Sequence, residues 1–161
     1  MKISRLSLSD TADRSALCLL LNEFATSENG GGHPMDETVL ARLPDQLAAC
    51  PTYIGLLAKE NDEPLGLLNA FWSVSSFKAR PLINIHDFTV TEGAQSHGIG
   101  RQMVTELERI GLEMKACKMT LEVLDGNTRA SALYQRMGFE FYQLDPSQGR
   151  ARLMQKILTE Q

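Results

Sequence analysis

Apolar and polar residues alternate along this chain of 161 residues in a way that predicts seven strands and four helices. Period-two alternation and short apolar runs indicate strands, whereas apolar residues three and four positions apart indicate helices. The expected strands are Lys2–Leu8, Tyr53–Lys59, Leu65–Val74, Leu82–Val90, Met119–Leu124, Phe139–Leu144 and Arg152–Ile157. The expected helices are one that begins after Ser9 and Asp10 and includes Phe24, and then Asp36–Ala49, Gly98–Ala116 and Asn127–Met137.

Residues that start or stop helices support these boundaries. Asp10 is an N-cap candidate, the glycine-rich stretch 29–34 ends the first helix, and Gly138 follows the last helix as its C′ residue. Pro44 is expected to kink or split the second helix, and residues 60–64 to form a hairpin loop. The order βααβββαβαββ predicts one α/β domain over residues 1–161, with a mixed, mostly antiparallel sheet of six to seven strands flanked by about four helices.

Charge and cysteine usage narrow the function classes. The net charge of −4 argues against binding to nucleic acid or to an anionic membrane, and an acidic surface tolerates cationic small molecules. The three cysteines, Cys18, Cys50 and Cys117, are scattered, which argues against a disulfide framework or a metal site and is typical of a reducing compartment. The start of the chain lacks a secretory signal, and the longest apolar stretch, 16–21, is too short to span a bilayer. We therefore expect a cytoplasmic, soluble protein without a metal.

The segment from Val90 to Arg101 joins a strand to a long amphipathic helix and is a candidate phosphate-binding turn. A helix N-terminus has unpaired backbone N–H groups and partial positive charge, and glycines at 98 and 100 would let a diphosphate approach that backbone. Two glycines alone are also compatible with a simple tight loop. No Gly-Lys-Ser/Thr follows, which excludes a Walker loop, and the third glycine and the repeating parallel units of a dinucleotide-binding fold are missing.

A second motif runs from Asn127 to Phe139, with Ala130, Leu133, Tyr134 and Gly138 within it. With both motifs in order, the chain resembles the GNAT superfamily of N-acetyltransferases. The resemblance implies that acetyl-CoA is the cosubstrate. Its pantetheine arm would pair with the strand that ends in Phe88, Thr89 and Val90. Its pyrophosphate would be held by backbone amides of Gln95, Ser96, His97, Gly98, Ile99, Gly100 and Arg101. Asn127 would contact the cofactor near the gap between two diverging strands, and it is also an N-cap candidate, which is compatible.

Acetyl transfer to an amine requires a deprotonated amine, a polarised thioester carbonyl and a proton for the leaving thiolate. Tyr134 is the expected acid, because a phenol with a pKa near ~10 can protonate a thiolate, and this tyrosine commonly has that role in the superfamily. The alternative is that the ring only packs against Ala130, Leu133 and Met137.

Three residues compete for the role of general base. Glu122, placed first, lies in a Leu-Glu-Val sequence that resembles ribosomal-protein alanine acetyltransferases. His86, placed second, stands where diamine and thialysine acetyltransferases have glutamate, and an ordinary histidine with a pKa near ~6.5 accepts a proton at neutral pH. Asp87 is third; alternation places it on the face opposite to His86 unless a bulge intervenes. A water chain without a single base is a further alternative.

The acceptor amine is the least determined feature of the sequence. The residues expected to face it are Glu23, Glu28, His33, Asp36, Glu37, Trp72, Phe77 and Tyr142. The carboxylates would attract a polyamine or an amino-acid-like amine, unless they form only a solvated acidic loop. The stretch 71–81 resembles diamine and thialysine acetyltransferases. Protein N-terminal or lysine acetylation, antibiotic modification and a non-catalytic acetyl-CoA sensor are the alternatives, and a homodimer is common in the superfamily.

Overall fold

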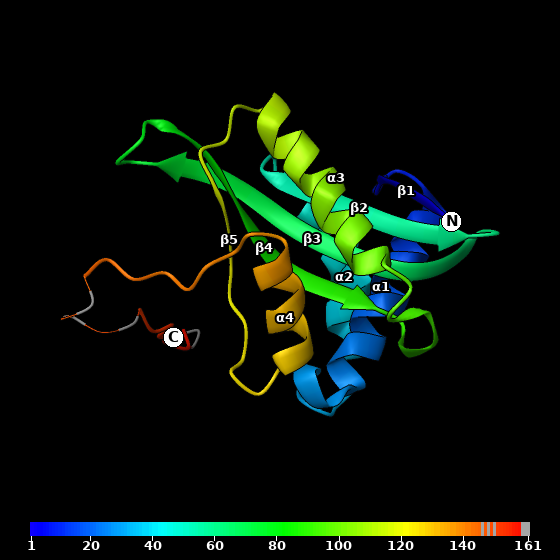
Figure 1. The fold of residues 1–161 in the computed structure, drawn as a ribbon. Coiled ribbons are helices and arrows are strands. Elements are labelled where there is room, and N and C mark those ends of the chain that lie inside the picture. The colour runs from blue at the N-terminus through cyan, green and yellow to red at the C-terminus, as the bar shows by residue number, and fades with distance from the viewer. Residues whose placement is uncertain (146, 148, 150, 159–161) are drawn as a thin grey trace.

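The computed structural model describes residues 1–145, 147, 149 and 151–158 (Figure 1). Over these residues it contains five strands and four α-helices. The strands are β1 (Lys2–Arg5), β2 (Tyr53–Glu60), β3 (Glu63–Ser75), β4 (Arg80–Val90) and β5 (Met119–Leu121). The α-helices are α1 (Thr11–Thr26), α2 (Glu37–Ala48), α3 (Ile99–Glu113) and α4 (Thr128–Arg136). Single 3₁₀ turns occur at Glu28–Gly30 and Glu92–Ala94.

The five strands lie in the sheet in chain order, β1-β2-β3-β4-β5. All neighbours are antiparallel except β4 and β5, which are parallel and are connected through α3. Asn61 and Asp62 form the β2–β3 turn with φ of 49° and 67°, the left-handed conformation that two-residue hairpin turns require. The strands therefore continue into the segment 60–64 that was expected to be loop, and Pro64 lies near the start of β3, beside a register shift at Ala58 and Lys59.

Helices cover both faces of the sheet (Figure 1). On one face, α3 contributes Ile99, Met103, Val104, Leu107 and Ile110 to a core shared with the sheet. On the other face, α1 and α2 bury Leu17, Leu20, Leu21 and Leu47 against Leu57 and Leu67. The apolar spacing of α3 predicted this packing. Pro44 is buried inside α2, which runs without a break through residues 37–48, so the expected split does not occur.

The two strands expected after α4 are not present, and this prediction was wrong. Residues 139–144 and 152–157 lie outside any strand, and the side chains of Leu144, Met154 and Ile157 are at least three-quarters exposed. A strand requires a neighbour that pairs with its backbone. Both segments have an alternating sequence pattern, but among the described residues no strand pairs with them along the edge of β5. β5 also ends at Leu121, earlier than expected.

Within the described ranges, no helix is long and apolar enough to cross a bilayer. The same residues hold no group of three or more His, Cys, Asp or Glu side chains arranged for a metal ion.

Candidate functional site

The site begins where β4 and β5 separate. The two strands pair over only three positions, Ile83 with Met119, Asn84 with Thr120 and Ile85 with Leu121. β4 continues to Val90, paired with β3 on its other side. Among the described residues, no strand pairs with the β5-facing edge of β4 over 86–90. On this side, the backbone N–H and C=O groups of Phe88, Thr89 and Val90 therefore have no strand partner in the part of the chain that the structure describes.

The phosphate turn follows the free edge directly. Gln95 is turned back onto the end of β4, because its Nε2 donates to the Val90 carbonyl at 2.8 Å. His97 Nδ1 lies 2.9 Å from the Gln95 carbonyl oxygen. Ser96 and Gly98 both have positive φ, 69° and 78°. Gly98 is the N-cap of α3, a position where its missing Cβ removes the strain of the left-handed conformation.

The N-terminus of α3 differs from those of the other helices. Asp10, Asp36 and Asn127 cap α1, α2 and α4 with side-chain oxygens that accept backbone N–H groups. No side chain caps α3, and its first turn carries no acidic residue. The first N–H groups of α3, at Ile99, Gly100 and Arg101, are therefore directed away from the helix with no capping side chain. This end of α3 suits an anion through both its amides and its dipole.

Gly100 has a packing role that the sequence analysis did not anticipate. A Cβ at this position would lie 3.1 Å from Leu133 Cδ2 and 3.3 Å from the Phe88 ring. The absence of a side chain thus lets α3 approach β4 and α4 closely. At Gly98, by contrast, an added Cβ would meet no atom within 4 Å, so that glycine is required by its φ.

Arg129 belongs to this site, although sequence reasoning missed it. From the first turn of α4 it donates Nη2 to the Ser96 hydroxyl at 2.9 Å and Nη1 to Gln95 Oε1. A cation at the start of a helix is opposed by the helix dipole, which is the signal that could have identified it. The guanidinium lies over the phosphate turn and links it to α4.

Asn127 caps α4, as expected, and accepts the Ala130 N–H at 3.1 Å. The cap orients a helix that presents Tyr134 to the sheet. The Tyr134 ring is buried between Phe88 and Phe139, with centroids 6.3 and 5.7 Å away. Burial raises the pKa of Tyr134 to about 12, so the phenol stays protonated at neutral pH. The ring packs against Phe88 and Phe139, and this packing is compatible with proton donation.

A bulge in β4 changes the expected arrangement of His86 and Asp87. The register passes from Asn69 opposite Asp87 to Ala70 opposite Ile85, so that His86 is the extra residue. Because Ile85 and Phe88 both face the α3 side, His86 and Asp87 both face the α1 side. His86 Nδ1 lies 3.4 Å from Asp87 Oδ1. The two residues form a pair on one face, which simple alternation had placed on opposite faces.

Glu122 follows the last paired residue of β5 and is exposed. Thr120 faces the α1 side, where its hydroxyl accepts Asn84 Nδ2 at 3.1 Å. Glu122 comes directly after Leu121, the last residue of β5 that pairs with β4. Both candidate bases therefore stand at the point where β4 and β5 separate.

The residues expected to face the acceptor amine lie in different parts of the structure. Glu23, Glu28, His33 and Glu37 are exposed around the α1–α2 connection. Asp36 instead caps α2, and hydrogen bonds from the Thr38 side chain and backbone lower the pKa of its carboxyl. Trp72 packs against the core on the α3 side.

Two aromatic candidates lie outside the α1–α2 connection. Phe77 is 97% exposed at the tip of the β3–β4 hairpin, which projects beyond the helices (Figure 1). Tyr142 is exposed after α4, with Lys118 Nζ 5.5 Å from its ring centroid. The structure therefore does not bring the eight expected residues into one cluster.

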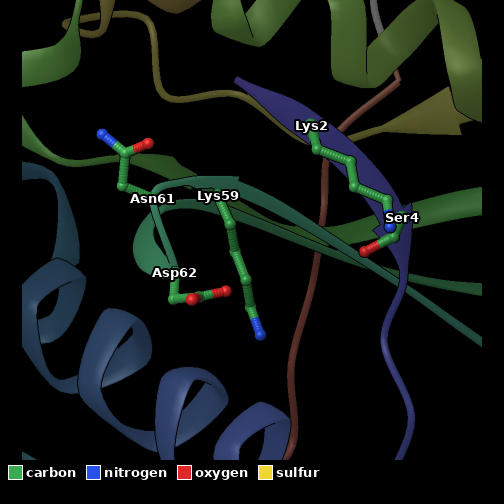
Figure 2. A pocket seen from close by; sticks show the side chains of 5 residues that line it. All are labelled: Lys2, Ser4, Lys59, Asn61 and Asp62. Carbon is green, nitrogen blue, oxygen red and sulfur yellow. The ribbon is translucent and has the colours of Figure 1, made fainter.

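Two surface pockets lie away from this site. One, of about 350 Å³, is lined by Lys2 and Ser4 of β1, Lys59 of β2 and the turn residues Asn61 and Asp62 (Figure 2). Its Lys59 is already paired with Asp13 of α1 at 2.6 Å. The other, of about 330 Å³, lies on α2 beside Val39, Arg42, Leu43 and Gln46. Neither contains a candidate catalytic residue.

Comparison of the sequence with known protein families identifies one match. The model of the "Acetyltransferase (GNAT) family" matches residues 19–139. Among curated proteins no match is found. A crystal structure of a probable acetyltransferase is similar with a TM-score of 0.82 and 20% identity, over 99% of this chain and 100% of that chain.

Two further solved structures share the fold at low identity. An aminoglycoside acetyltransferase from an uncultured soil metagenomic sample, in complex with sisomicin, has a TM-score of 0.75 and 16% identity, over 99% of this chain and 96% of that chain. The ribosomal-protein-alanine N-acetyltransferase from Brucella melitensis biovar Abortus 2308 has a TM-score of 0.69 and 15% identity, over 90% and 99%. At these identities the likeness concerns the fold alone.

Proposed function

This chain belongs to the acetyltransferase (GNAT) family and is an acyltransferase, and we propose that it transfers the acetyl group of acetyl-CoA to a primary amine of a small molecule. The observation that carries the proposal is that an unpaired strand edge is followed along the chain by a helix N-terminus without a side-chain cap. The unpaired edge of β4 ends at Val90, and the turn over residues 91–98 connects it to the N-terminus of α3. An acyl-pantetheine diphosphate needs such a combination, because its arm is an extended chain of amides and its far end is an anion.

Arg129 and the α3 amides would hold the diphosphate. The guanidinium forms a fork of donors suited to phosphate oxygens, and it lies beside Ser96 and Gln95 at the start of the turn. Arg101, exposed in the first turn of α3, adds a second positive charge. Asn127 would fix the N-terminus of α4 beside the arm of the cofactor.

The positions of the acid and the candidate bases support direct attack by the amine. Tyr134 reaches β4 from the α3 side, where it contacts Phe88, whereas His86 lies on the α1 side. In direct attack the amine adds to one face of the thioester carbonyl, and the sulfur leaves as the tetrahedral intermediate collapses. An acid and a base on opposite sides of the gap between β4 and β5 serve these two steps.

The protons balance as follows. The ammonium first loses a proton to the base, and the neutral amine then forms the new N–C bond while the C–S bond breaks. Tyr134 protonates the departing thiolate, and the second proton that the nitrogen loses as the amide forms restores the Tyr134 phenol. One proton is released to solvent for each acetyl group transferred. His86 and Glu122 are the candidates for the base.

A small polyamine or amino-acid-like amine is the proposed acceptor. The carboxylates of Glu23, Glu28 and Glu37 are exposed around the α1–α2 connection, on the side of the sheet that His86 faces. They would attract a compound that carries more than one positive charge. The net charge of −4 is consistent with such an acceptor.

A thiol-release assay with acetyl-CoA and a panel of amines tests the proposal. The panel contains spermidine, lysine analogues, aminoglycosides and N-terminal peptides. We expect release with one of the small amines. Release only with the peptides would assign the chain to protein acetylation instead. Acetyl-CoA binding in calorimetry without release for any amine would assign it to a non-catalytic sensor.

A further inference from the structure

A chain of polar side chains crosses three strands beneath α1 and ends at His86. The Tyr53 hydroxyl on β2 donates to Asn69 Oδ1 on β3 at 2.8 Å. Asn69 Nδ2 donates to Asp87 Oδ2 on β4 at 3.0 Å. The other carboxylate oxygen, Oδ1, lies 3.4 Å from His86 Nδ1. Each contact joins neighbouring strands or neighbouring residues, so all four side chains of this series belong to the sheet.

The surroundings of Asn69 indicate that this chain is not incidental. Asn69 is 1% exposed in the middle of an apolar strand, where an unpaired amide would be costly. Both ends of its amide are used, the oxygen by Tyr53 and the nitrogen by Asp87. The donors and acceptors therefore run in one direction, from the phenol through the amide to the carboxylate.

Gly55 on β2 makes the first link possible. It stands opposite Asn69 in the register, and the Tyr53 ring lies across it. A Cβ at Gly55 would overlap the Tyr53 hydroxyl and would come within 2.8 Å of its Cζ. Burial, and then the negative charge of Asp87, raise the pKa of Tyr53, so this phenol is a donor across the physiological range.

The ring of His86 has a second support. Phe71 lies between Tyr53 and His86, with centroids 5.6 Å and 5.7 Å away and an edge-on arrangement at His86. Phe71 holds the imidazole against β3 while its outer face stays accessible, since the His86 side chain is 65% exposed. The hydrogen bond from Asn69 holds Asp87, and only 30% of the Asp87 side chain is exposed.

We propose that Tyr53, Asn69 and Asp87 are positioning residues that hold the His86 imidazole with its Nδ1–H on Asp87, so that Nε2 is the atom that takes the proton from the acceptor ammonium. This inference rests on the proposed N-acetyl transfer and selects His86 over Glu122 as its base. Asp87 is a carboxylate whose second oxygen is already occupied by Asn69. Oδ1 is the oxygen that lies beside His86, and it can only accept a hydrogen bond. This favours the imidazole tautomer with the proton on Nδ1. The same carboxylate stabilises the imidazolium that forms when Nε2 is protonated.

The first test reads the tautomer without any reaction. Nitrogen-15 resonances of His86 in the full-length protein, recorded above the pH at which the ring titrates, distinguish a protonated Nδ1 from a protonated Nε2. We expect the proton on Nδ1 in the wild type and a mixture or reversal in Asp87→Asn. A proton on Nε2 in the wild type would overturn the proposal, whatever the protein acetylates.

The second test is a double-mutant cycle on turnover. Asp87→Asn is expected to lower kcat about 100-fold, and Tyr53→Phe about 3- to 10-fold, with the KM for acetyl-CoA unchanged. In a His86→Ala background neither change should have a further effect, because a positioning residue acts only through the residue it positions. If Asp87→Asn and Tyr53→Phe lowered kcat by the same factors in the His86→Ala background as in the wild type, these residues would serve the fold alone. That result would overturn the proposal.

The pH dependence of turnover adds a readout that loss of packing would not change. The charged and titratable groups that interact along this chain are Asp87 on β4, Tyr53 on β2 and Arg5 on β1. We expect turnover of Asp87→Asn to recover in part at higher pH, where more of the amine is already neutral. Glu106→Gln, an exchange of a carboxylate paired with Arg109 on α3, is the matched control and should behave as the wild type.

Failure of the proposed function is distinguishable from failure of this inference. If the chain transfers no acetyl group, no variant has turnover to compare, but the His86 tautomer still reports whether Asp87 holds Nδ1. If acetyl transfer is found and the tautomer or the cycle disagrees, only the positioning chain is rejected.

Discussion

Arg129 Nη2 and the Ser96 hydroxyl are joined by a hydrogen bond of 2.9 Å across 33 positions of the sequence. The bond connects the first turn of α4 to the turn before α3. Both motifs that suggested the family therefore meet at one place, through a side chain that belongs to neither motif's defining residues. The region between them is where the diphosphate of acetyl-CoA is proposed to bind.

Arg129→Ala is expected to raise the Kd for acetyl-CoA about 10-fold, close to the contribution of one charged hydrogen-bond pair. Titration calorimetry measures the change. Arg136→Ala, which removes a guanidinium from the last turn of the same helix, is the control and should leave the Kd unchanged. The activity with acetyl-pantetheine, which has no diphosphate, should be insensitive to Arg129→Ala. An equal loss with both acetyl donors would argue against contact with the diphosphate.

Tyr134→Phe should lower kcat by roughly 10²–10⁴ and leave the affinity for acetyl-CoA nearly unchanged. The ring and its contacts with Phe88 and Phe139 remain, and only the proton donor is lost. Steady-state kinetics and calorimetry on the same preparations provide both numbers. Turnover near that of the wild type would leave Tyr134 with its packing role alone.

The alkaline stability of the protein should depend on the same hydroxyl. The pKa of Tyr134 is about 12 in the folded protein, against about 10 in an unfolded chain. Between these values the unfolded chain has lost a proton that the folded protein keeps, so the free energy of unfolding falls as pH rises from about 10 to about 12. The full loss is roughly 2 to 3 kcal/mol.

Urea unfolding at pH 8 and at pH 11 measures about half of this loss, because pH 11 lies midway between the two pKa values. In Tyr134→Phe the decline should be smaller than in the wild type, and the remainder should include the contribution of Tyr53, whose pKa is also raised. Identical declines in the two proteins would show that the Tyr134 hydroxyl is solvated in solution.

Gly55→Ala should lower the free energy of unfolding by about 1 to 3 kcal/mol, the usual cost of an added methyl group in a filled core. The new Cβ would come within 2.9 Å of Leu6 Cβ and would displace the Tyr53 ring. Gly126→Ala is the control, because a Cβ there meets no atom within 4 Å and its φ is not in the left-handed region. Equal stabilities of the two variants would contradict the close packing of Tyr53 over Gly55.

The sequence by itself determined the features that depend on neighbouring residues. The helix positions of α1, α3 and α4 follow from apolar spacing and from the caps at Asp10 and Asn127, because a cap and its N–H partners lie within one turn. The turn between β4 and α3 was predicted for the same reason, since its strand, glycines and helix are consecutive. The Tyr134 position came from a motif that lies on one helix.

Only the tertiary structure decided the features that depend on strand register and on close approach. The bulge that brings His86 and Asp87 to one face is a mismatch of one residue between β3 and β4, and no local pattern records it. Asn69, Tyr53 and Arg129 acquire their roles from partners on other elements, and Gly55 and Gly100 from the atoms that occupy their missing side-chain space. The segments 139–144 and 152–157 have a strand pattern, but a strand exists only where another backbone pairs with it. Caps, turns and helix positions depend on residues close together in the sequence, whereas strand register and side-chain contacts depend on how the whole chain packs.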